Sequence, residues 1–404
     1  MHILLIHQAF AAIDEPGGTR HHEFARFLAS RGNRVTVIAS PINYLTGGAA
    51  HFSNSESGQH DEKVTILRAY TYQALHKSFV HRVFSFFSFM VSSFFIGLRV
   101  KNVDLIWGTS PPIFQGWTAW MLARMKRVPF LFEVRDLWPE FAIAVGVLKN
   151  PTLIKMSLWL ERFLYQHADK VMVNSPGFVK HVKNRGARSV ELIPNGADPE
   201  MFDPLDRGDD FRRKHQLEKS YVALYAGAHG ISNDLTVILD AARFLKGKPG
   251  IRIVLLGDGK EKGSLQKQAA TLELTNVLFL PPVPKYEMAS ALAGSDACIA
   301  LLKPLDAYRT TYPNKVFDYM AAGRPVVLAI DGVIREVLEA AGCGIFCQPG
   351  DSKSMADAIT MLAENRDRGR AMGLAGRRYL EEHFNRAEIA ESLLKLLLEM
   401  TPKA

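Results

Sequence analysis

This 404-residue sequence has few cysteines, and it lacks internal repeats, low-complexity tracts and an apolar run of full membrane length. Only three cysteines occur, at Cys298, Cys343 and Cys347, which excludes a disulfide-stapled scaffold and favours a reducing compartment. Neither a second cysteine pair nor a close histidine accompanies Cys343 and Cys347. They therefore favour buried small side chains over a metal site, and we expect no metal.

The amino terminus lacks the charged start of a signal peptide. Its short apolar run, Ile3–Ile6, is typical of a first buried strand, so we expect the protein to stay in the cytoplasm. With 48% hydrophobic and 22% charged residues, the composition is that of a soluble globular protein. The length predicts two to three domains with large cores.

Acidic residues are scarce in the first half of the chain. Residues 1–200 carry 22 Lys and Arg against 15 Asp and Glu, which gives +7 of the overall +8. Such a surplus favours an anionic partner: phosphate, an acidic membrane surface or nucleic acid. The basic residues are not interleaved with aromatic ones in a recognisable nucleic-acid-binding module, so we expect no nucleic acid partner.

Short aliphatic and β-branched runs alternate with helical stretches along the whole chain. The expected strands are Ile3–Ile6, Arg34–Ala39, Val64–Ala69, Asp104–Gly108, Pro129–Val134, Val171–Asn174, Glu191–Ile193, Val222–Tyr225, Ile253–Leu256, Val277–Leu280, Ala297–Leu301 and Val326–Ala329. Because these runs are apolar throughout rather than alternating, they predict parallel sheets covered by helices on both faces.

Two doubly wound α/β domains facing a central cleft follow from this alternation. We expect one domain over residues 1–200, a charged linker over 201–219 and a second domain over 220–383. Residues 384–404 predict an amphipathic helix that returns to the first domain. In such sheets, ligands bind at the carboxyl ends of the strands, where helix N-termini offer N–H groups to phosphate.

The first candidate motif is Glu15–His22, a glycine-containing loop between the first strand and the helix expected over Glu23–Ser30. The dinucleotide-binding pattern G-x-G-x-x-G is absent here, which disfavours hydride chemistry. Gly17 and Gly18 allow a backbone to approach a phosphate closely, although an ordinary glycine turn explains them equally well.

A second motif, Phe132–Glu140, ends a strong strand with charged residues. Arg135, Asp136 and Glu140 stand where a cleft should open, and buried charges are rare unless they are paired or functional. A structural ion pair of Arg135 with Asp136 or with Glu140 is the alternative.

Later segments suggest a phosphate site in the second domain. A helix starting near Pro313 can aim its free N–H groups and Lys315 at a diphosphate, while Asp318, on the same face, can accept the hydroxyls of a ribose. Further turns and glycine loops that follow strands are Ile193–Asp198, Tyr225–Gly230 and Leu256–Gly259.

Taken in order, these motifs resemble those of the family-four retaining glycosyltransferases of the GT-B fold. Within that family the pattern is similar to the bacterial O-antigen and capsule subgroup that includes L-fucosamine transferases. The motifs that carry the resemblance are Gly17–His21, Val134–Glu140, Ile193–Asp198 and Pro313–Pro325.

The resemblance implies a nucleotide-sugar donor, UDP by subgroup, held mainly by the second domain, with no metal or other cofactor. It also implies an acceptor held mainly by the first domain. The expected donor-side residues are Gly17, Gly18, Gly227, His229, Arg309, Pro313, Asn314, Lys315 and Asp318. Those expected at the reacting sugar are Arg135, Asp136 and Lys315, and those on the acceptor side are Arg20, His21 and Glu140.

Three departures from the family pattern concern the donor site. Thr310 stands where the first acid of the family's E-x7-E motif would fall, and the second acid is Asp318 rather than Glu. The family's basic pair after the first strand of the second domain is missing, with His229 near the arginine position. Lys315 and Arg309 are therefore the expected substitutes at the diphosphate.

Residues 83–98 form an uncharged segment rich in phenylalanine and bounded by basic residues. A membrane-spanning helix needs about 20 apolar residues, so the segment predicts either a buried helix or an interfacial helix over residues 81–101 that meets a lipid surface. The interfacial reading would place the enzyme on the inner face of the cell membrane, beside a polyprenyl-diphosphate acceptor. A nucleotide-sugar 2-epimerase of the same fold is the alternative activity.

Overall fold

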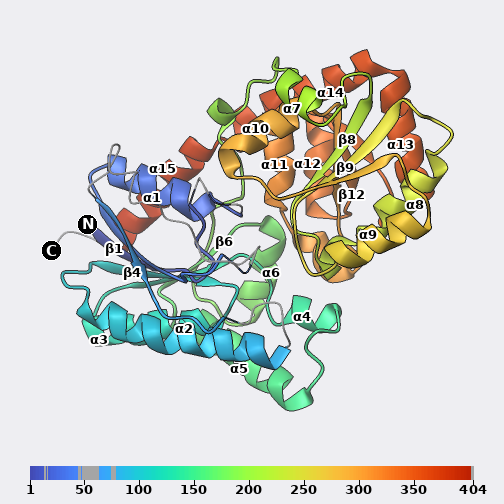
Figure 1. Ribbon diagram of the computed structural model, residues 1–404. Helices are drawn as coiled ribbons and strands as arrows, with labels where there is room; N and C mark the ends of the chain where they lie inside the picture. The colour runs from blue at the N-terminus through green and yellow to red at the C-terminus, as the bar shows by residue number, and fades with distance from the viewer. Residues whose placement is uncertain (13–14, 16, 44–46, 48–62, 74–78, 402–404) are drawn as a thin grey trace. The chain divides into compact units, whose positions relative to one another are not determined.

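The computed structural model describes residues 1–12, 15, 17–43, 47, 63–73 and 79–401. The chain divides into two compact units (Figure 1). Unit 1 comprises Met1–Pro194 together with Ala387–Ala404, and unit 2 comprises Asn195–Arg386.

Unit 1 is built on a seven-stranded parallel sheet in the order β3-β2-β1-β4-β5-β6-β7. Its strands are β1 (His2–Ile6), β2 (Arg34–Ala39), β3 (Val64–Arg68), β4 (Leu105–Ser110), β5 (Phe130–Val134), β6 (Lys170–Val173) and β7 (Val190–Leu192). The central strands β1, β4 and β5 are buried along their whole length, which is why their sequences are mostly apolar.

Helices cover both faces of this sheet. They are α1 (Arg20–Ser30), α2 (Phe79–Arg99), α3 (Phe114–Lys126), α4 (Glu140–Ala144), α5 (Pro151–His167), α6 (Pro176–Asn184) and α15 (Arg386–Met400). Figure 1 shows α1 and α15 on one face and α2, α3 and α5 on the other. The last helix buries Ile389, Leu393 and Leu397 in the same core cluster as α1, so the C-terminal helix packs on unit 1.

Unit 2 has a six-stranded parallel sheet in the order β10-β9-β8-β11-β12-β13. Its strands are β8 (Tyr221–Ala226), β9 (Ile251–Leu256), β10 (Val277–Leu280), β11 (Ala297–Leu301), β12 (Val326–Ala329) and β13 (Gly344–Phe346). Its helices are α7 (Asp209–Lys214), α8 (Thr236–Phe244), α9 (Lys262–Thr271), α10 (Lys285–Ala293), α11 (Asn314–Ala321), α12 (Val333–Ala341), α13 (Ser352–Glu364) and α14 (Arg366–His383).

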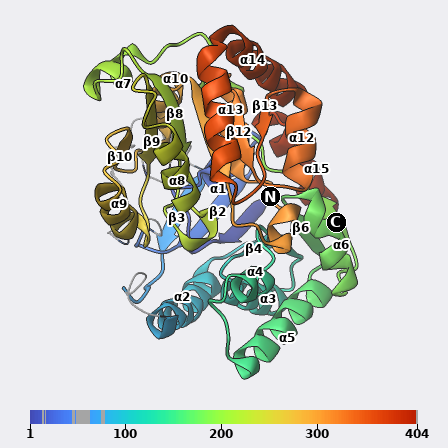
Figure 2. The same cartoon turned by 90° about the vertical axis from the view of Figure 1, so that its right-hand side faces the viewer.

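Side chains alternate between two core clusters along the strands of unit 2. On β8, Ala223 and Tyr225 enter the cluster shared with α8, α9 and α13, whereas Val222 and Leu224 enter the cluster shared with α10, α11 and α12. Figure 2 shows α8 and α13 lying side by side on the first of these faces. Two doubly wound parallel sheets, the predicted fold class, are therefore confirmed.

The division between the units differs from the expected boundary at residue 200. It falls after Pro194, and the stretch expected to be a linker, 201–219, belongs to unit 2. Phe202, Phe211 and Leu217 are buried in the core of that unit, which ties the stretch to it.

Candidate active site

The loops after β8 and β9 in unit 2 pack backbone against backbone. Gly227 (φ 144°), Gly257 (φ 149°) and Gly259 (φ 154°) all adopt conformations that favour glycine. A Cβ on Gly257 would overlap the carbonyl of Gly227, and one on Gly259 would overlap the backbone of His229. Glycine at these positions lets the two loops meet at the carboxyl edge of the sheet.

Lys315, in the first turn of α11, points toward this edge. Its Nζ atom is buried and lies 3.9 Å from the centroid of the Tyr225 ring. A Cβ on Gly227 would lie 2.8 Å from Nζ, so the glycine makes room for the ammonium group. Within the described residues Nζ has no hydrogen-bond partner, and burial lowers the pKa of Lys315 to about 7. A buried ammonium without a counter-charge is costly, so this position suits an anionic ligand.

His229 lies beside the same glycines. Its backbone N–H donates to Asp258 O (2.7 Å), and its carbonyl accepts from Glu261 N–H (2.9 Å). Both ring nitrogens are buried and have no partner among the described residues. Burial, together with the charges of Lys262 and Lys315, lowers the pKa of His229 to about 4. The neutral ring therefore offers one donor and one acceptor that the described protein leaves unused.

Asp318 does not share a partner with Lys315, although both lie on α11. Its Oδ1 lies 2.6 Å from Nζ of Lys285, and Asn314 Nδ2 donates to its Oδ2 over 3.4 Å. The side-chain Oδ1 of Asn314 in turn accepts from the guanidinium of Arg386 (3.1 Å). Pro313 is the N-cap of α11 and fixes the approach to the helix.

Arg309 is paired with an acidic side chain. Its guanidinium forms an ion pair with Asp331 (3.1 Å) and is 56% exposed. The arginine therefore neutralises a carboxylate just before α12. Positive charge at the glycine loops comes from the buried Lys315 and from Lys262, whose Nζ donates to Gly257 O (2.7 Å).

In unit 1, the glycine loop after β1 leads into α1, which begins at Arg20. Gly17 has φ 147°, which favours glycine, whereas a Cβ on Gly18 would meet no atom within 4 Å. The preceding residue, Pro16, lies outside the described residues. Only Gly17 is thus required by the backbone, and Gly18 leaves open space at the helix start.

Arg20 and His21 were expected on the acceptor side, but both side chains lie inside unit 1. His21 Nε2 is 2.6 Å and Arg20 Nε is 3.3 Å from the buried carboxylate of Glu133 on β5. Trp107 Nε1–H donates to the same carboxylate (3.1 Å). Burial opposes ionisation of Glu133, but His21, Arg20 and Arg135 hold its pKa at about 2. The two basic residues therefore position the loop and α1.

Arg20 also joins this loop to the end of the domain. Its guanidinium donates to the carbonyls of Pro194 (2.6 Å) and Ile193 (2.7 Å). This explains why the predicted turn at Ile193–Asp198 accompanies the glycine loop in the sequence. Sequence reasoning missed the centre of the network, Glu133, although a carboxylate within the apolar run of β5 was the available signal.

Arg135 and Asp136 follow β5 directly. The Arg135 N–H donates to Ser110 O (3.0 Å), which places the loop beside the end of β4. Burial raises the pKa of Asp136 to about 6, against the opposing effect of Arg135. In the described part of the chain Arg135 forms no ion pair with Asp136 or Glu140, and its Nε is buried without a partner. The alternative of a structural pair is therefore not what the structure shows.

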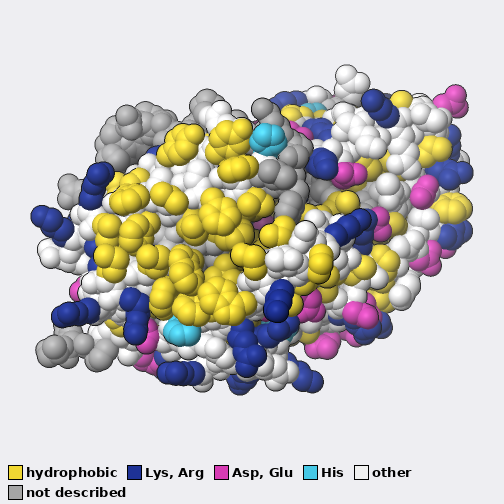
Figure 3. Space-filling view, turned by 90° about the horizontal axis from the view of Figure 1, so that it is seen from below, with side chains coloured by type: hydrophobic (Ala, Val, Ile, Leu, Met, Phe, Trp, Pro, Cys, Tyr) yellow, Lys and Arg dark blue, Asp and Glu magenta, His cyan; other side chains and the backbone are white. Residues whose placement is uncertain are grey.

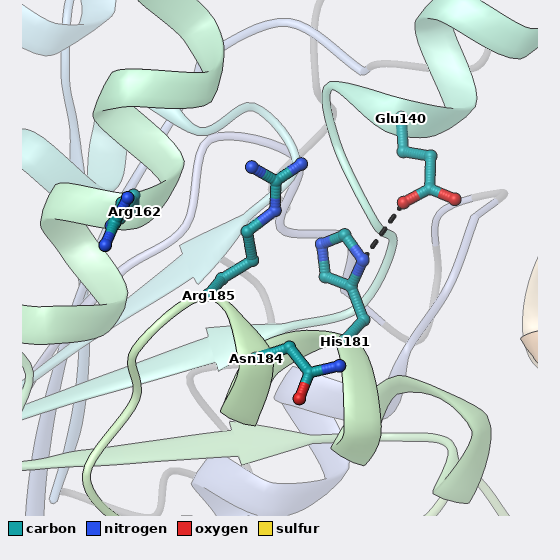
Figure 4. A pocket seen from close by; sticks show the side chains of 5 residues that line it. All are labelled: Glu140, Arg162, His181, Asn184 and Arg185. Carbon is teal, nitrogen blue, oxygen red and sulfur yellow. Dashed lines mark ion pairs between the residues drawn. The ribbon is translucent and has the colours of Figure 1, made fainter.

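Glu140 points away from this loop. Its carboxylate pairs with Nδ1 of His181 (3.0 Å) at a pocket of about 360 Å³ that Arg162, Asn184 and Arg185 also line (Figure 4). His181 Nε2 contacts the buried Glu161 (2.7 Å). Glu140 thus connects α4 to α6 and does not join Asp136 or His21.

No cluster of three or more His, Cys, Asp or Glu side chains suited to a metal ion occurs among the described residues. The three cysteines are free and buried, as expected for small apolar side chains.

Comparisons with known proteins cover nearly all of this framework. The family described as "Glycosyl transferase 4-like domain" matches residues 17–196, and "Glycosyl transferases group 1" matches residues 207–379. The chain belongs to the family-four glycosyltransferases. Its two units have the GT-B fold of that family.

Individual relatives of this glycosyltransferase are distant. A D-inositol 3-phosphate glycosyltransferase of Nocardia farcinica is 24% identical over 295 residues, which cover 69% of this chain and 63% of the relative. The chain thus spans less than two thirds of that relative's length. Sucrose-phosphate synthase from Thermosynechococcus elongatus has a similar structure (TM-score 0.79, 18% identity, 99% and 98% coverage). Anabaena HepE in complex with UDP-glucose is also similar (TM-score 0.75, 16% identity, 99% and 100% coverage).

The Lys285–Asp318 pair allows a test of the expected ribose contact in this glycosyltransferase. We expect Asp318→Ala to raise the donor KM by about tenfold or more, because each charge-assisted bond to a ribose hydroxyl contributes about 1.5–3 kcal/mol. It should also abolish discrimination between UDP and its 2′-deoxyribose analogue. Competition binding with the two nucleotides measures both effects.

Lys285→Met is the matched control, because it removes the same ion pair and leaves the carboxylate. Its donor KM should stay within about threefold of the native value. An equal rise of the donor KM in both variants would show that the Lys285–Asp318 pair acts only on the stability of unit 2.

Proposed function

We propose that this protein transfers a sugar, with retention of anomeric configuration, from a UDP-sugar to a polyprenyl-diphosphate-linked acceptor in the synthesis of a bacterial surface polysaccharide. The transferred group is a hexosyl residue. The enzyme acts in the cytoplasm, on the inner face of the cell membrane.

The observation that carries the donor half of the proposal is the buried ammonium of Lys315 among glycine loops, which has no hydrogen-bond partner in the described part of the chain. A diphosphate supplies the missing counter-charge, and His229 offers a further hydrogen-bond donor beside it. The similar fold of HepE holds UDP-glucose, which supports UDP as the nucleotide and a hexose as the sugar.

Glycosyl transfer needs stabilisation of the leaving diphosphate more than it needs a nucleophile on the protein. Negative charge grows on the diphosphate as the glycosidic bond breaks, so a fixed ammonium at Lys315 stabilises the transition state more than the ground state. The acceptor hydroxyl attacks from the face that the diphosphate leaves, and a leaving-group oxygen accepts its proton. Retention follows from that same-face attack.

In this proposal, the loop of unit 1 that carries Arg135 and Asp136 contacts the reacting sugar. An Asp136 carboxylate with a pKa of about 6 is mostly ionised at neutral pH and can hold a sugar hydroxyl. The exposed aromatic side chains of α2, and the surplus of basic residues in the first half of the chain, support a lipid-linked acceptor.

Thermal unfolding in the presence of UDP, GDP and double-stranded DNA tests the class of protein. UDP alone should raise the melting temperature, by an amount that grows with ligand concentration as mass action requires. A screen of UDP-hexoses with a polyprenyl-diphosphate-linked sugar then tests the reaction, by UDP release and by the mass of the glycolipid. Conversion of the UDP-sugar to its 2-epimer without transfer would replace the proposal with the epimerase.

Asp136→Asn should lower kcat by about 100-fold with donor affinity within about twofold, because the carboxylate acts at the reacting sugar. In the native enzyme the carboxylate is lost as the pH falls through about 6, so kcat should fall as the pH drops below that value. The variant should lose this dependence. Steady-state kinetics between pH 5 and 8 measure it, over about one unit either side of the expected pKa.

Glu140→Gln is the control for Asp136, because Glu140 faces His181 instead of the loop. Its kcat and pH profile should match those of the native enzyme. A larger loss in Glu140→Gln than in Asp136→Asn would assign the acceptor side to the α4–α6 pocket.

A further inference from the structure

Among the described side chains of helix α2, the buried positions hold mostly small residues, whereas several large apolar residues are exposed. The inward positions are Ser85, Phe89, Ser93 and Gly97, of which only Phe89 is large, and a Cβ on Gly97 would overlap the side chain of Leu122 on α3. The outward positions are Phe84 (62% exposed), Phe87, Val91 and Phe95 (58% exposed). A helix on the water-facing surface of a soluble protein has the reverse pattern, with large apolar residues inside.

The apolar surface continues across two further helices of unit 1. Met125 on α3, and Met156 and Trp159 on α5, are each more than half exposed. Ring contacts link the three helices, with Phe87 and Phe114 at 5.1 Å and Trp117 and Trp159 at 6.2 Å between centroids. Figure 3 shows hydrophobic side chains gathered over this part of unit 1, with Lys and Arg along its edges.

Acidic side chains are almost lacking from these helices. Over α2, α3 and α5 the single acidic residue is Glu161, which is 1% exposed and contacts His181. The basic residues in the same helices are Arg82, Arg99, Arg124, Lys126, Lys155 and Arg162. An apolar surface framed by cations complements a bilayer that contains anionic lipids, with its apolar interior beneath negative headgroups.

We propose that α2, α3 and α5 together form a docking face that lies on an anionic lipid bilayer, with the exposed Phe, Met and Trp side chains entering the headgroup region. We call this surface the three-helix face. By length and composition α2 could cross a membrane. However, it is fastened along one side to α3, where Thr118 donates to Met90 O (3.0 Å) and Lys126 to Val100 O (2.7 Å). Only its outer side is therefore offered to lipid.

This inference rests on the proposed function in one respect: the proposed function explains why docking is useful, since docking brings the enzyme to a lipid-linked acceptor. Docking itself requires neither donor nor acceptor. A second copy of the chain is the competing occupant of such a surface, and the experiment separates the two.

Sedimentation with vesicles tests the three-helix face. We use phosphatidylcholine vesicles and vesicles in which about a third of the lipid is phosphatidylglycerol, and expect at least tenfold tighter binding to the second, weakened by salt. Phe84→Glu/Phe95→Glu on α2 should weaken this binding by about 100-fold, and Met156→Glu/Trp159→Glu on α5 by at least tenfold. All these side chains are more than half exposed, so the melting temperature should change little.

Leu398→Glu is the matched control. Leu398 is 53% exposed on α15, which lies on the opposite face of the same sheet (Figure 1). The control should bind vesicles like the native protein. Loss of binding in the α2 variant with full binding in the α5 variant would overturn the three-helix face.

Two further outcomes would overturn the inference. One is absence of vesicle binding from a protein that still transfers sugar in detergent, which leaves the proposed function intact. The other is a dimer in analytical ultracentrifugation that the α2 and α5 variants convert to monomers without any native binding to vesicles. Conversely, vesicle binding without UDP binding would support the docking face and contradict the proposed donor.

Discussion

Lys315→Met is expected to make the protein more stable and nearly inactive. Removing a buried ammonium that has no described partner should stabilise unit 2 by about 1–4 kcal/mol, because the native fold holds the pKa of this lysine at about 7 instead of 10.5. The same change removes the positive charge at the leaving diphosphate. We expect kcat/KM to fall by about 100- to 1,000-fold, with the larger part in kcat.

The effect of Lys315→Met on the stability of the protein should depend on pH. Below about pH 7 the lysine is charged in both the folded and the unfolded chain, so the native protein carries the full cost of burial. Between about pH 7 and 10.5 only the unfolded chain keeps the proton, and the cost disappears as the pH rises. The difference in melting temperature between Lys315→Met and the native protein should therefore be largest below pH 7 and shrink above it.

The affinity for the donor, unlike the stability, should fall as the pH rises. A diphosphate binds the charged lysine, so the native enzyme should lose UDP affinity as the pH rises above about 7, and Lys315→Met should show no such loss. Lys353→Met, which removes an exposed lysine of α13, is the control and should leave both properties unchanged. A constant difference in stability across this pH range would contradict the buried charge.

The strands were predictable because parallel sheets buried on both faces need continuous apolar runs. Every one of the twelve expected strands is present, with its ends within two residues of the expected position. The strand β13 (Gly344–Phe346) was missed, since three half-buried residues at a sheet edge give no such run. The stretch 201–219 was mistaken for a linker because its charges outnumber the few side chains, such as Phe211, that enter the core.

For the candidate site, the sequence indicated the loops but not the partners. Glycines after β8 and β9 and the start of α11 at Asn314 follow from local patterns. The pairs Arg309–Asp331, Glu140–His181 and Lys285–Asp318 join residues that are 22 to 41 positions apart, and no local pattern specifies them. An isolated charged residue therefore could not be assigned to a ligand or to a structural pair.

Helix α2 shows the same limit for packing. Aromatic residues occur on all sides of it, so periodicity left both a buried and an interfacial helix open. The structure distinguishes the two sides through Gly97, which faces Leu122 on α3, and leaves Phe84 and Phe95 exposed. The deciding contact comes from another helix and not from α2 itself.

Glu133→Gln is expected to cause the largest loss of stability in unit 1. The carboxylate is fully buried between Arg20, His21 and Trp107, and the substitution breaks its buried ion pair with Arg20. Breaking such a pair costs about 3–5 kcal/mol, which urea unfolding can measure from the midpoint and slope. Glu191→Gln, which breaks the more exposed pair with Lys170, is the control and should cost about 1 kcal/mol or less.

Two further measurements separate the ion pair from a simple loss of packing at Glu133. The folded pKa of about 2 lies below the usual 4.5, so the carboxylate stabilises fully above about pH 4.5 and progressively less as the pH falls toward 2. The difference between Glu133→Gln and the native protein should shrink over that range. Adding Arg20→Met to Glu133→Gln should cost less than the sum of the two single losses, because the ion pair is already broken in the first variant. If the double variant is instead less stable by the sum of the two single losses, Glu133 contributes through packing and not through charge.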